Sequence, residues 1–405
     1  STWTREQVVL IAFNGYYIFL WSTFNTMMVP LLPHYMKDLD GSILGHGMVL
    51  GAVQVGWLLA FPFLQLAPIS PRSMLNLGMQ FFILAAGIIL ASPSVPTLIL
   101  GRTAEGFGNA ILSGLLTGTL AREIPADALG QAVGLRNAFG CLGMCLGPAL
   151  GGVLYPLGGI RLPMSIVLGF AILLPAMFQL VPSKCLAALE EGGSGRSAGI
   201  DCRPLLKKPE VMRLLTVSSV CLLPTSFSYL AVPKLLHDDF HLSAFMTMMV
   251  WLVWDLARTC SSLAGGAIDA SKPWLALGIA LQLLCYTLAA LTLEYAATAT
   301  VFKYMYFALW GVVFSIGGLI GPSFFKAFAA TEHGEQVGRY VELMVLRDFV
   351  TTVTLLLGPM LTAVLLPILG FRCCLISLAA FCISSVILLA MPASNRGPAA
   401  EATDA

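Results

Sequence analysis

Two pairs of charged residues lie inside long apolar segments of the sequence, where burying a charge costs free energy. Arg102 and Glu105 are three positions apart, and so are Asp255 and Arg258. This spacing puts each pair on one face of a helix. Glu105 could bind a proton or only neutralise Arg102, and Asp255 could bind a proton or form a self-contained pair with Arg258. The residue types therefore predict binding of protons or ions.

Asp348 is the residue that we expect to carry a proton. A carboxyl group in a cavity of low dielectric constant can take up and release a proton near neutral pH. Arg347 precedes it, but successive side chains of a helix point about 100° apart. Alternatively, Asp348 forms a structural ion pair with Arg136 or Arg347.

Signatures of hydrolytic and metal-dependent enzymes are missing from the sequence. There is no H-E-x-x-H and no G-x-S-x-G pattern, and the five histidines fall in loops or at segment ends. The ten cysteines lie mostly in apolar runs, where they act as small hydrophobic side chains. We expect a protein that is not an enzyme, with no cofactor and no metal.

The composition predicts an integral membrane protein. Of the 405 residues, 58% are hydrophobic and 11% are charged, whereas a globular domain carries about 25% charged residues. A membrane-spanning helix needs about 20 apolar residues. Twelve such spans are predicted, at 8–36, 43–67, 73–91, 95–121, 128–156, 160–181, 211–236, 243–268, 273–293, 298–329, 336–366 and 370–391. The expected fold is all-α, with twelve transmembrane helices.

The spans divide into two sets of six. A Gly/Ser-rich, charged stretch at 182–210 predicts a linker between an N-terminal half at 1–181 and a C-terminal half at 211–391, followed by a disordered tail at 392–405. Most lysines and arginines fall in the loops on the side of both termini. The positive-inside rule therefore predicts that the termini and the linker are cytoplasmic.

The two halves are copies of one another. Residues 135–161 align with 346–372 at an offset of 211, and residues 22–32 align with 225–235 at an offset of 203. The first alignment matches charged and conformationally special residues: Arg136 with Arg347, Gly147 with Gly358, Pro148 with Pro359, and Gly159 with Gly370. Repeats of this kind enclose a substrate site near the membrane midplane.

The stretch GMCLGPALGG at 143–152 carries four glycines and a proline inside an apolar span. Gly143, Gly147 and Gly151 recur every four residues and share one face, where a neighbouring backbone can approach closely. We interpret this face as an interface on which the halves rock, or alternatively as plain tight packing. The same motif includes Pro148, which kinks the helix, and Gly152, and it is repeated by Gly358 and Pro359.

These motifs resemble those of the major facilitator superfamily, in its drug:proton antiporter branch. GMCLGPALGG fits the antiporter motif G-x-x-x-G-P-x-x-G-G, RTAEGFGNA at 102–110 fits the span-4 motif, and VPLLP at 29–33 fits the span-1 motif. Within this branch the sequence is most similar to the vesicular amine and polyamine transporters, which share an aspartate eleven residues before the span-11 proline. That aspartate is Asp348 here.

The sequence departs from this resemblance at several positions. The loop motif after span 2 is degenerate, whereas its counterpart in the second half keeps Asp269, which we expect near Arg136 or Arg122. Trp21 stands where the monoamine transporters carry an aspartate. The resemblance also implies that Asp238 pairs with Arg102 as an outer gate, although a solvated loop acid is the alternative.

The resemblance implies a cavity lined by spans 1, 4, 7 and 10. Polar and aromatic residues of these spans could bind the substrate: Asn25, Asn109, Tyr229, Tyr306 and Trp310. Aromatic rings could enclose a cation there, or they could simply pack between helices.

We expect a proton-coupled antiporter for a small organic, amine-like or drug-like cation. Its partners would be the solute, protons and the lipid bilayer but no nucleic acid, and it would act as a monomer in the plasma membrane or an acidic vesicle. One alternative is an organic-anion uniporter or exchanger that uses Arg136 and Arg347. Another is a transporter-like receptor or scaffold that does not transport.

Overall fold

The computed structural model describes residues 3–66, 69–91, 94–124, 126–182, 206–267, 272–298, 300–301, 303–316 and 340–390. Most of the predicted linker, at 183–205, and the predicted tail at 392–405 lie outside the described residues. Asp269 is also outside them.

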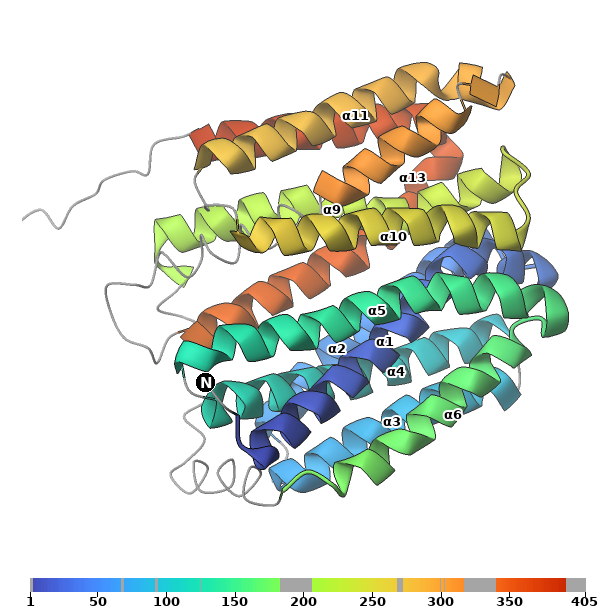
Figure 1. Cartoon of the computed structure of the whole chain (residues 1–405). Helices are drawn as coiled ribbons and strands as arrows, with labels where there is room; N and C mark the ends of the chain where they lie inside the picture. Colours follow the sequence, from blue (N-terminus) through green and yellow to red (C-terminus); the bar gives the residue numbers. More distant parts are fainter. Residues whose placement is uncertain are drawn as a thin grey trace, which may run out of the picture.

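The described residues form a bundle of helices that run roughly side by side (Figure 1). They are α1 (Arg5–Asp38), α2 (Ile43–Leu66), α3 (Pro71–Ala91), α4 (Val95–Glu123), α5 (Ala126–Gly158), α6 (Arg161–Phe178), α9 (Pro209–Asp238), α10 (Ala244–Ala267), α11 (Lys272–Thr298), the helix Lys303–Ile316, and α13 (Tyr340–Ala390). α13 is two helices joined at a kink at Gly370. With α13 divided there, the helices follow the twelve predicted spans in order. Seven described helices are long and apolar enough to cross a membrane.

Local sequence sets where these helices begin. The Thr4 hydroxyl accepts a hydrogen bond from the Gln7 backbone, and the Gln7 side chain accepts one from the Thr4 backbone, which satisfies two free donors at the start of α1. Ser94 caps α4 in the same way with Thr97. Prolines lie within α1, α5, α9 and α13. Each proline removes one backbone hydrogen bond of its helix. A membrane helix tolerates this loss because neighbouring helices and side chains satisfy the freed backbone group.

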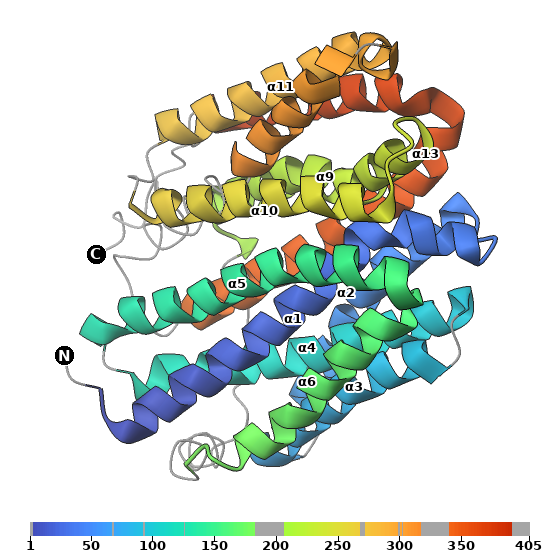
Figure 2. The same ribbon diagram turned by 45° about the vertical axis from the view of Figure 1, so that its right-hand side comes forward.

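The two halves have the same internal packing. α1 packs on α5 in the first half and α9 packs on α13 in the second. Between the halves, α5 contacts α10 and α2 contacts α13. In both views α3 and α6 lie at one outer side of the bundle and α11 lies at the other (Figures 1 and 2). The buried charged residues lie on α4 and α10, between these two outer sides.

Backbone conformation also repeats between the halves. Gly159, after α5, has φ +56°, and Gly370, at the kink in α13, has φ +71°. Both values lie in the left-handed region, which glycine enters at little cost. The two positions are matched by the offset of 211, so the same turn ends the fifth helix of each half.

The glycine motif packs on two different partners. A Cβ atom at Gly147 would lie 2.5 Å from the carbonyl oxygen of Thr23 on α1, and one at Gly358 would lie 2.8 Å from the carbonyl carbon of Ser226 on α9. Thr23 and Ser226 are themselves matched in the repeat. Gly152 instead faces the other half, where a Cβ would lie 2.9 Å from that of Met248 on α10. The motif thus combines tight packing within a half and close approach between halves.

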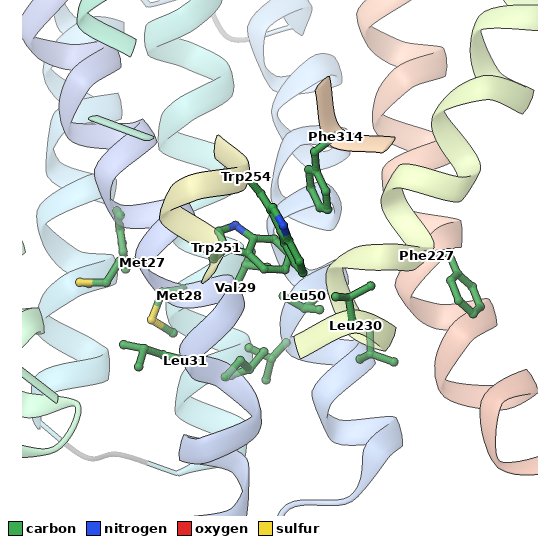
Figure 3. Packing of buried hydrophobic residues seen from close by; sticks show 14 of the residues in the cluster. Met27, Met28, Val29, Leu31, Leu50, Phe227, Leu230, Trp251, Trp254 and Phe314 are labelled. Carbon is green, nitrogen blue, oxygen red and sulfur yellow. The ribbon is translucent and has the colours of Figure 1, made fainter. Parts of the chain in front are cut away.

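The core is continuous across the two halves. Figure 3 shows Met27 and Met28 of α1 near Trp251 and Trp254 of α10, with Phe314 beyond them. The rings of Trp254 and Phe314 stack at 5.6 Å with an interplanar angle of 13°. These aromatic side chains pack near the contact between α1 of the first half and α10 of the second.

We predict that Gly147→Leu destabilises the protein by about 1–3 kcal/mol, because the larger side chain forces α5 away from α1. Gly134→Leu on the same helix is the matched control, since nothing lies within 4 Å of a Cβ there. Thermal unfolding followed by size-exclusion chromatography measures both variants. Equal melting temperatures for the two would contradict this packing.

Candidate functional site

A cavity of about 180 Å³ lies between the two halves. It is lined from α1, α2, α4, α5, α9, α10 and α13, which are the inner helices. Polar and aromatic side chains make up much of its wall: Trp21, Asn25, Gln54, Arg102, Tyr229, Trp251, Asp255 and Arg258. Such a site between helices of a bundle is a typical place for a small ligand.

Arg102 and Glu105 form a buried ion pair at one side of this cavity. Their side chains are 2% and 0% exposed, and Arg102 Nη1 donates to Glu105 Oε2 at 2.5 Å. Arg102 Nη2 also donates to Asn25 Oδ1 at 2.9 Å, which links α4 to α1. The guanidinium lies 5.6 Å from the centre of the Phe24 ring. Arg102 is therefore neutralised and fixed in orientation by its own half.

Asp255 is the cavity carboxylate with an unused polar atom. It is 1% exposed, and among the described residues its Oδ2 has no hydrogen-bond partner. Arg258 donates instead to the Tyr229 hydroxyl at 3.2 Å. In the described part of the chain no ion pair joins Asp255 to Arg258, so the two charges act on each other only at longer range. The self-contained pair weighed from the sequence is not formed.

The side chain of Asn109 forms hydrogen bonds in the interior of the first half. In the amide orientation that satisfies all neighbours, its nitrogen donates to the Tyr17 hydroxyl and its oxygen accepts from the indole nitrogens of Trp21 and Trp57, each at 3.0 Å. It does not line the cavity. The sequence placed Asn109 correctly on an inner helix, but its hydrogen bonds are already used.

Tyr306 and Trp310 also lie away from the cavity. Both are buried in an aromatic cluster in which Trp310 contacts Tyr286 at 5.8 Å and Phe314 at 6.4 Å between ring centres. Tyr306 packs edge-on against Phe240 at 5.5 Å. Helix packing, the alternative weighed from the sequence, describes these two residues, because Trp251 and Trp254 stand between them and the centre.

Arg136 lies at the other end of α5 from the glycine motif. Its Nε donates to Asn14 Oδ1 at 2.8 Å, and the Asn14 amide in turn donates to the Leu116 carbonyl at 2.9 Å. Asp348, on α13 of the other half, interacts with Arg136 electrostatically and is itself exposed. The side chain of Arg347 is outside the described residues.

Asp238 is not brought to Arg102. It ends α9, is 42% exposed, and forms an ion pair with Lys234 one turn earlier. His237 Nε2 lies 3.9 Å from its other oxygen. Because Arg102 is satisfied by Glu105 and Asn25, the outer gate between Asp238 and Arg102 is not formed in this structure.

The comparisons with known proteins agree with this architecture. Residues 16–344 match the Major Facilitator Superfamily. The chain belongs to this superfamily. A probable multidrug-efflux transporter of Mycobacterium tuberculosis is 28% identical over 233 residues, which are 57% of this chain and 47% of the relative. A probable vesicular acetylcholine transporter of Danio rerio is 23% identical over 362 residues, 85% of this chain and 71% of the relative.

The match to the mycobacterial protein thus spans about half the length of that relative. Among solved structures, a bacterial homolog of the human lysosomal transporter Spinster, in an inward-facing and unoccupied conformation, superposes with a TM-score of 0.72. The sequence identity is 14%, and 96% of this chain and 95% of that chain are covered, so the likeness is one of fold. This superfamily member has several helices long and apolar enough to cross a membrane, as expected of a multi-pass membrane protein of this family. The resemblance to the antiporter branch is confirmed.

Sequence reasoning missed several cavity residues of this superfamily member, among them two tryptophans and a glutamine. Trp251 lies four positions before Asp255, and Trp21 lies four before Asn25, so each shares a helix face with a residue that was identified. Gln54 follows Val53, and both line the cavity. Extending each candidate by one helical turn would have found the two tryptophans.

We predict that Arg102→Leu destabilises the protein by about 3–5 kcal/mol, because it leaves Glu105 as a buried charge without its partner. The double variant Arg102→Leu/Glu105→Leu should recover most of that loss, since both charges are then removed. Thermal unfolding of the two variants and of Glu105→Leu alone completes the double-mutant cycle. A double variant no more stable than Arg102→Leu would show that the pair is not the main constraint at this site.

Proposed function

We propose that the protein is a proton-coupled antiporter of a small organic cation that works by alternating access. The observation that carries this proposal is the buried carboxylate of Asp255, which faces the cavity between the halves with one oxygen unpaired. A buried carboxylate without an ion-pair partner is stabilised either by a proton or by a cationic ligand. A proton on Asp255 prevents binding of the cation, and a bound cation prevents protonation of Asp255. This competition is the basis of exchange between the proton and the cation.

The surroundings of Asp255 favour a cation with apolar parts. Trp21, Trp251 and Tyr229 line the same cavity, and aromatic faces attract organic cations. The rings of Tyr229 and Trp251 are 6.3 Å apart, so the two form one continuous wall. The cavity volume of about 180 Å³ suits a small solute. Multidrug efflux and vesicular acetylcholine transport by the relatives are consistent with this class.

Asp348 and Arg136 support a second proposal, which concerns the movement of the halves. Arg136 lies nearer the N-terminal end of α5 than the glycine motif does. Their electrostatic interaction crosses from one half to the other. We propose that this interaction holds that end of the halves together and is broken when the halves rock apart. Glu105 neutralises Arg102 in this scheme, so coupling depends on Asp255 and Asp348.

We also propose the arrangement in the membrane. Both termini and the linker at 182–210 face the cytoplasm, because most of the lysines and arginines lie in the loops on that side. The two halves, 1–181 and 211–391, move as the rocking units of a monomer. The membrane is the plasma membrane or that of an acidic vesicle, where a proton gradient is present.

We predict that Asp255→Asn abolishes uptake of an organic cation against its gradient and also strongly reduces exchange of labelled for unlabelled cation, because a carboxamide keeps the volume but can neither carry the proton nor neutralise the cation. Proteoliposomes with an acidic interior and ethidium or acetylcholine as solute measure both activities. Asp40→Asn is the matched control: this loop aspartate is exposed with φ 50°, which asparagine tolerates. Concentrative uptake by Asp255→Asn would contradict the proposal.

Asp348→Asn tests the carboxylate singled out from the sequence. Loss of both uptake and exchange is expected if Asp348 acts through Arg136 on the movement of the halves. Loss of uptake alone would instead assign the proton to Asp348 and not to Asp255.

The anion alternative is tested at Arg136. This residue does not line the cavity, and its hydrogen bonds go to Asn14 and Asn137. We therefore predict that Arg136→Gln lowers the transport of every solute by a similar factor, and that Arg136→Lys restores much of it. The KM values of an organic cation and of benzoate measure the effect. A KM that rises in Arg136→Lys only for benzoate would favour the anion exchanger, because lysine keeps the charge but loses the bidentate geometry.

A further inference from the structure

A second and larger cavity, of about 740 Å³, opens at the end of the bundle where α1 ends and α2 begins. Four of the five histidines of the chain line it: His34, His46, His237 and His241. We call this cavity the histidine vestibule. The transport scheme proposed above uses none of these residues.

Two of the histidines occupy equivalent positions in the two halves. The offset of 203 that aligns 22–32 with 225–235 also carries His34 onto His237. Their rings lie 4.3 Å apart between centres, with an interplanar angle of 63°. Equivalent residues that touch one another lie where the internal two-fold axis of the repeat passes between the halves. Rocking of one half against the other, about an axis in the membrane plane and perpendicular to this two-fold axis, changes their separation.

The contact belongs to the surface on which the halves meet. His34, on α1, also has a hydrogen bond to the second half, between its Nε2 and the hydroxyl of Thr247 on α10 at 3.3 Å. The next residue of α10, Met248, is the one that packs against Gly151 and Gly152 of α5. His34 therefore contacts both α9 and α10 at the point where the halves are closest at this end.

The charged groups around the pair balance one another. Lys37 and Asp38 on α1, and Lys234 and Asp238 on α9, act electrostatically on the two rings. His241 follows α9, His46 on α2 has an unpartnered buried Nε2 among the described residues, and α10 presents only the neutral Thr247 hydroxyl. Two lysines and two aspartates cancel, so the protons on the histidines set the sign of the charge here.

We propose that His34 and His237 form a proton-operated latch between the halves. Neutral imidazoles pack edge to face and keep this end closed, whereas two imidazolium rings at this distance repel each other and separate α1 from α9. Acid on this face then opens the transporter toward it. The inference rests on the proposed alternating-access function, and the proposed orientation makes this the extracytoplasmic face.

The test measures the distance between the halves in the absence of solute and of any gradient. The full chain, with its ten cysteines replaced, carries spin labels at Leu44→Cys on α2 and Phe245→Cys on α10, two exposed positions beside the vestibule. Distances by pulsed electron paramagnetic resonance in nanodiscs are recorded from pH 8 to pH 4. We expect the distribution to shift to longer distances as the pH falls and both rings become protonated.

Variants of the pair decide whether the histidines cause the shift. His34→Phe and His237→Phe each keep an aromatic contact but leave at most one charge, so each should remain closed at pH 4. His237→Arg places a permanent charge beside His34 and should open at higher pH than the unmodified protein. His241→Asn, in the vestibule but off the axis, is the matched control and should keep the full pH response, because asparagine tolerates the φ of 52° at this position.

The latch is overturned if the unmodified protein shows no change in distance with pH, or if His34→Phe and His237→Phe respond as the unmodified protein does. Because no solute is present, that outcome leaves proton-coupled transport by Asp255 intact. Conversely, failure of transport in proteoliposomes with a normal pH-dependent distance would refute the proposed function and not the latch.

Discussion

The cost of burying charge in an apolar bundle is the constraint on which this structure depends. Arg102 and Glu105 are both buried, and each is tolerable only because the other is within hydrogen-bond distance. Arg102 is held by Glu105 and Asn25 within its own half and does not reach Asp238. Asp255 is the exception among the buried acids, because its nearest basic residue, Arg258, is directed to the Tyr229 hydroxyl. That arrangement leaves one carboxylate in the cavity available for a proton or a cation.

Close approach of backbones builds the frame around that charge. Apolar helices gain little from the hydrophobic effect inside a lipid bilayer, so they rely on small residues that allow tight packing. Gly147 and Gly358 provide this in the two halves, against Thr23 and Ser226. This close packing joins α1 to α5 and α9 to α13 within the halves. The cavity lies between the halves, so a ligand held there would contact both.

The internal repeat places equivalent residues of the two halves close to the axis between them. This has a different effect at the two ends of the bundle. At one end His34 meets its counterpart His237 across the axis. At the other, Arg136 of the first half faces Asp348 of the second, which is not its equivalent residue. Two histidines repel each other when both are protonated, whereas a charged arginine and a charged aspartate attract each other. We therefore expect the two ends to respond differently to protonation.

The sequence by itself determined the membrane class, the twelve spans, the two-fold repeat and the superfamily, because hydropathy and glycine and proline spacing are local properties that need no knowledge of packing. It also identified the buried charges and two of the cavity residues, Asn25 and Tyr229. Only the tertiary structure decided which partners those charges take. Asn109 lies on an inner helix as expected, yet it points into a packed interior and not into the cavity, since the rotation of each helix about its axis is set by its neighbours. Trp310 lies on the helix Lys303–Ile316, which does not line the cavity. The meeting of His34 with His237 likewise required three dimensions, because it depends on how two distant helices approach the same axis.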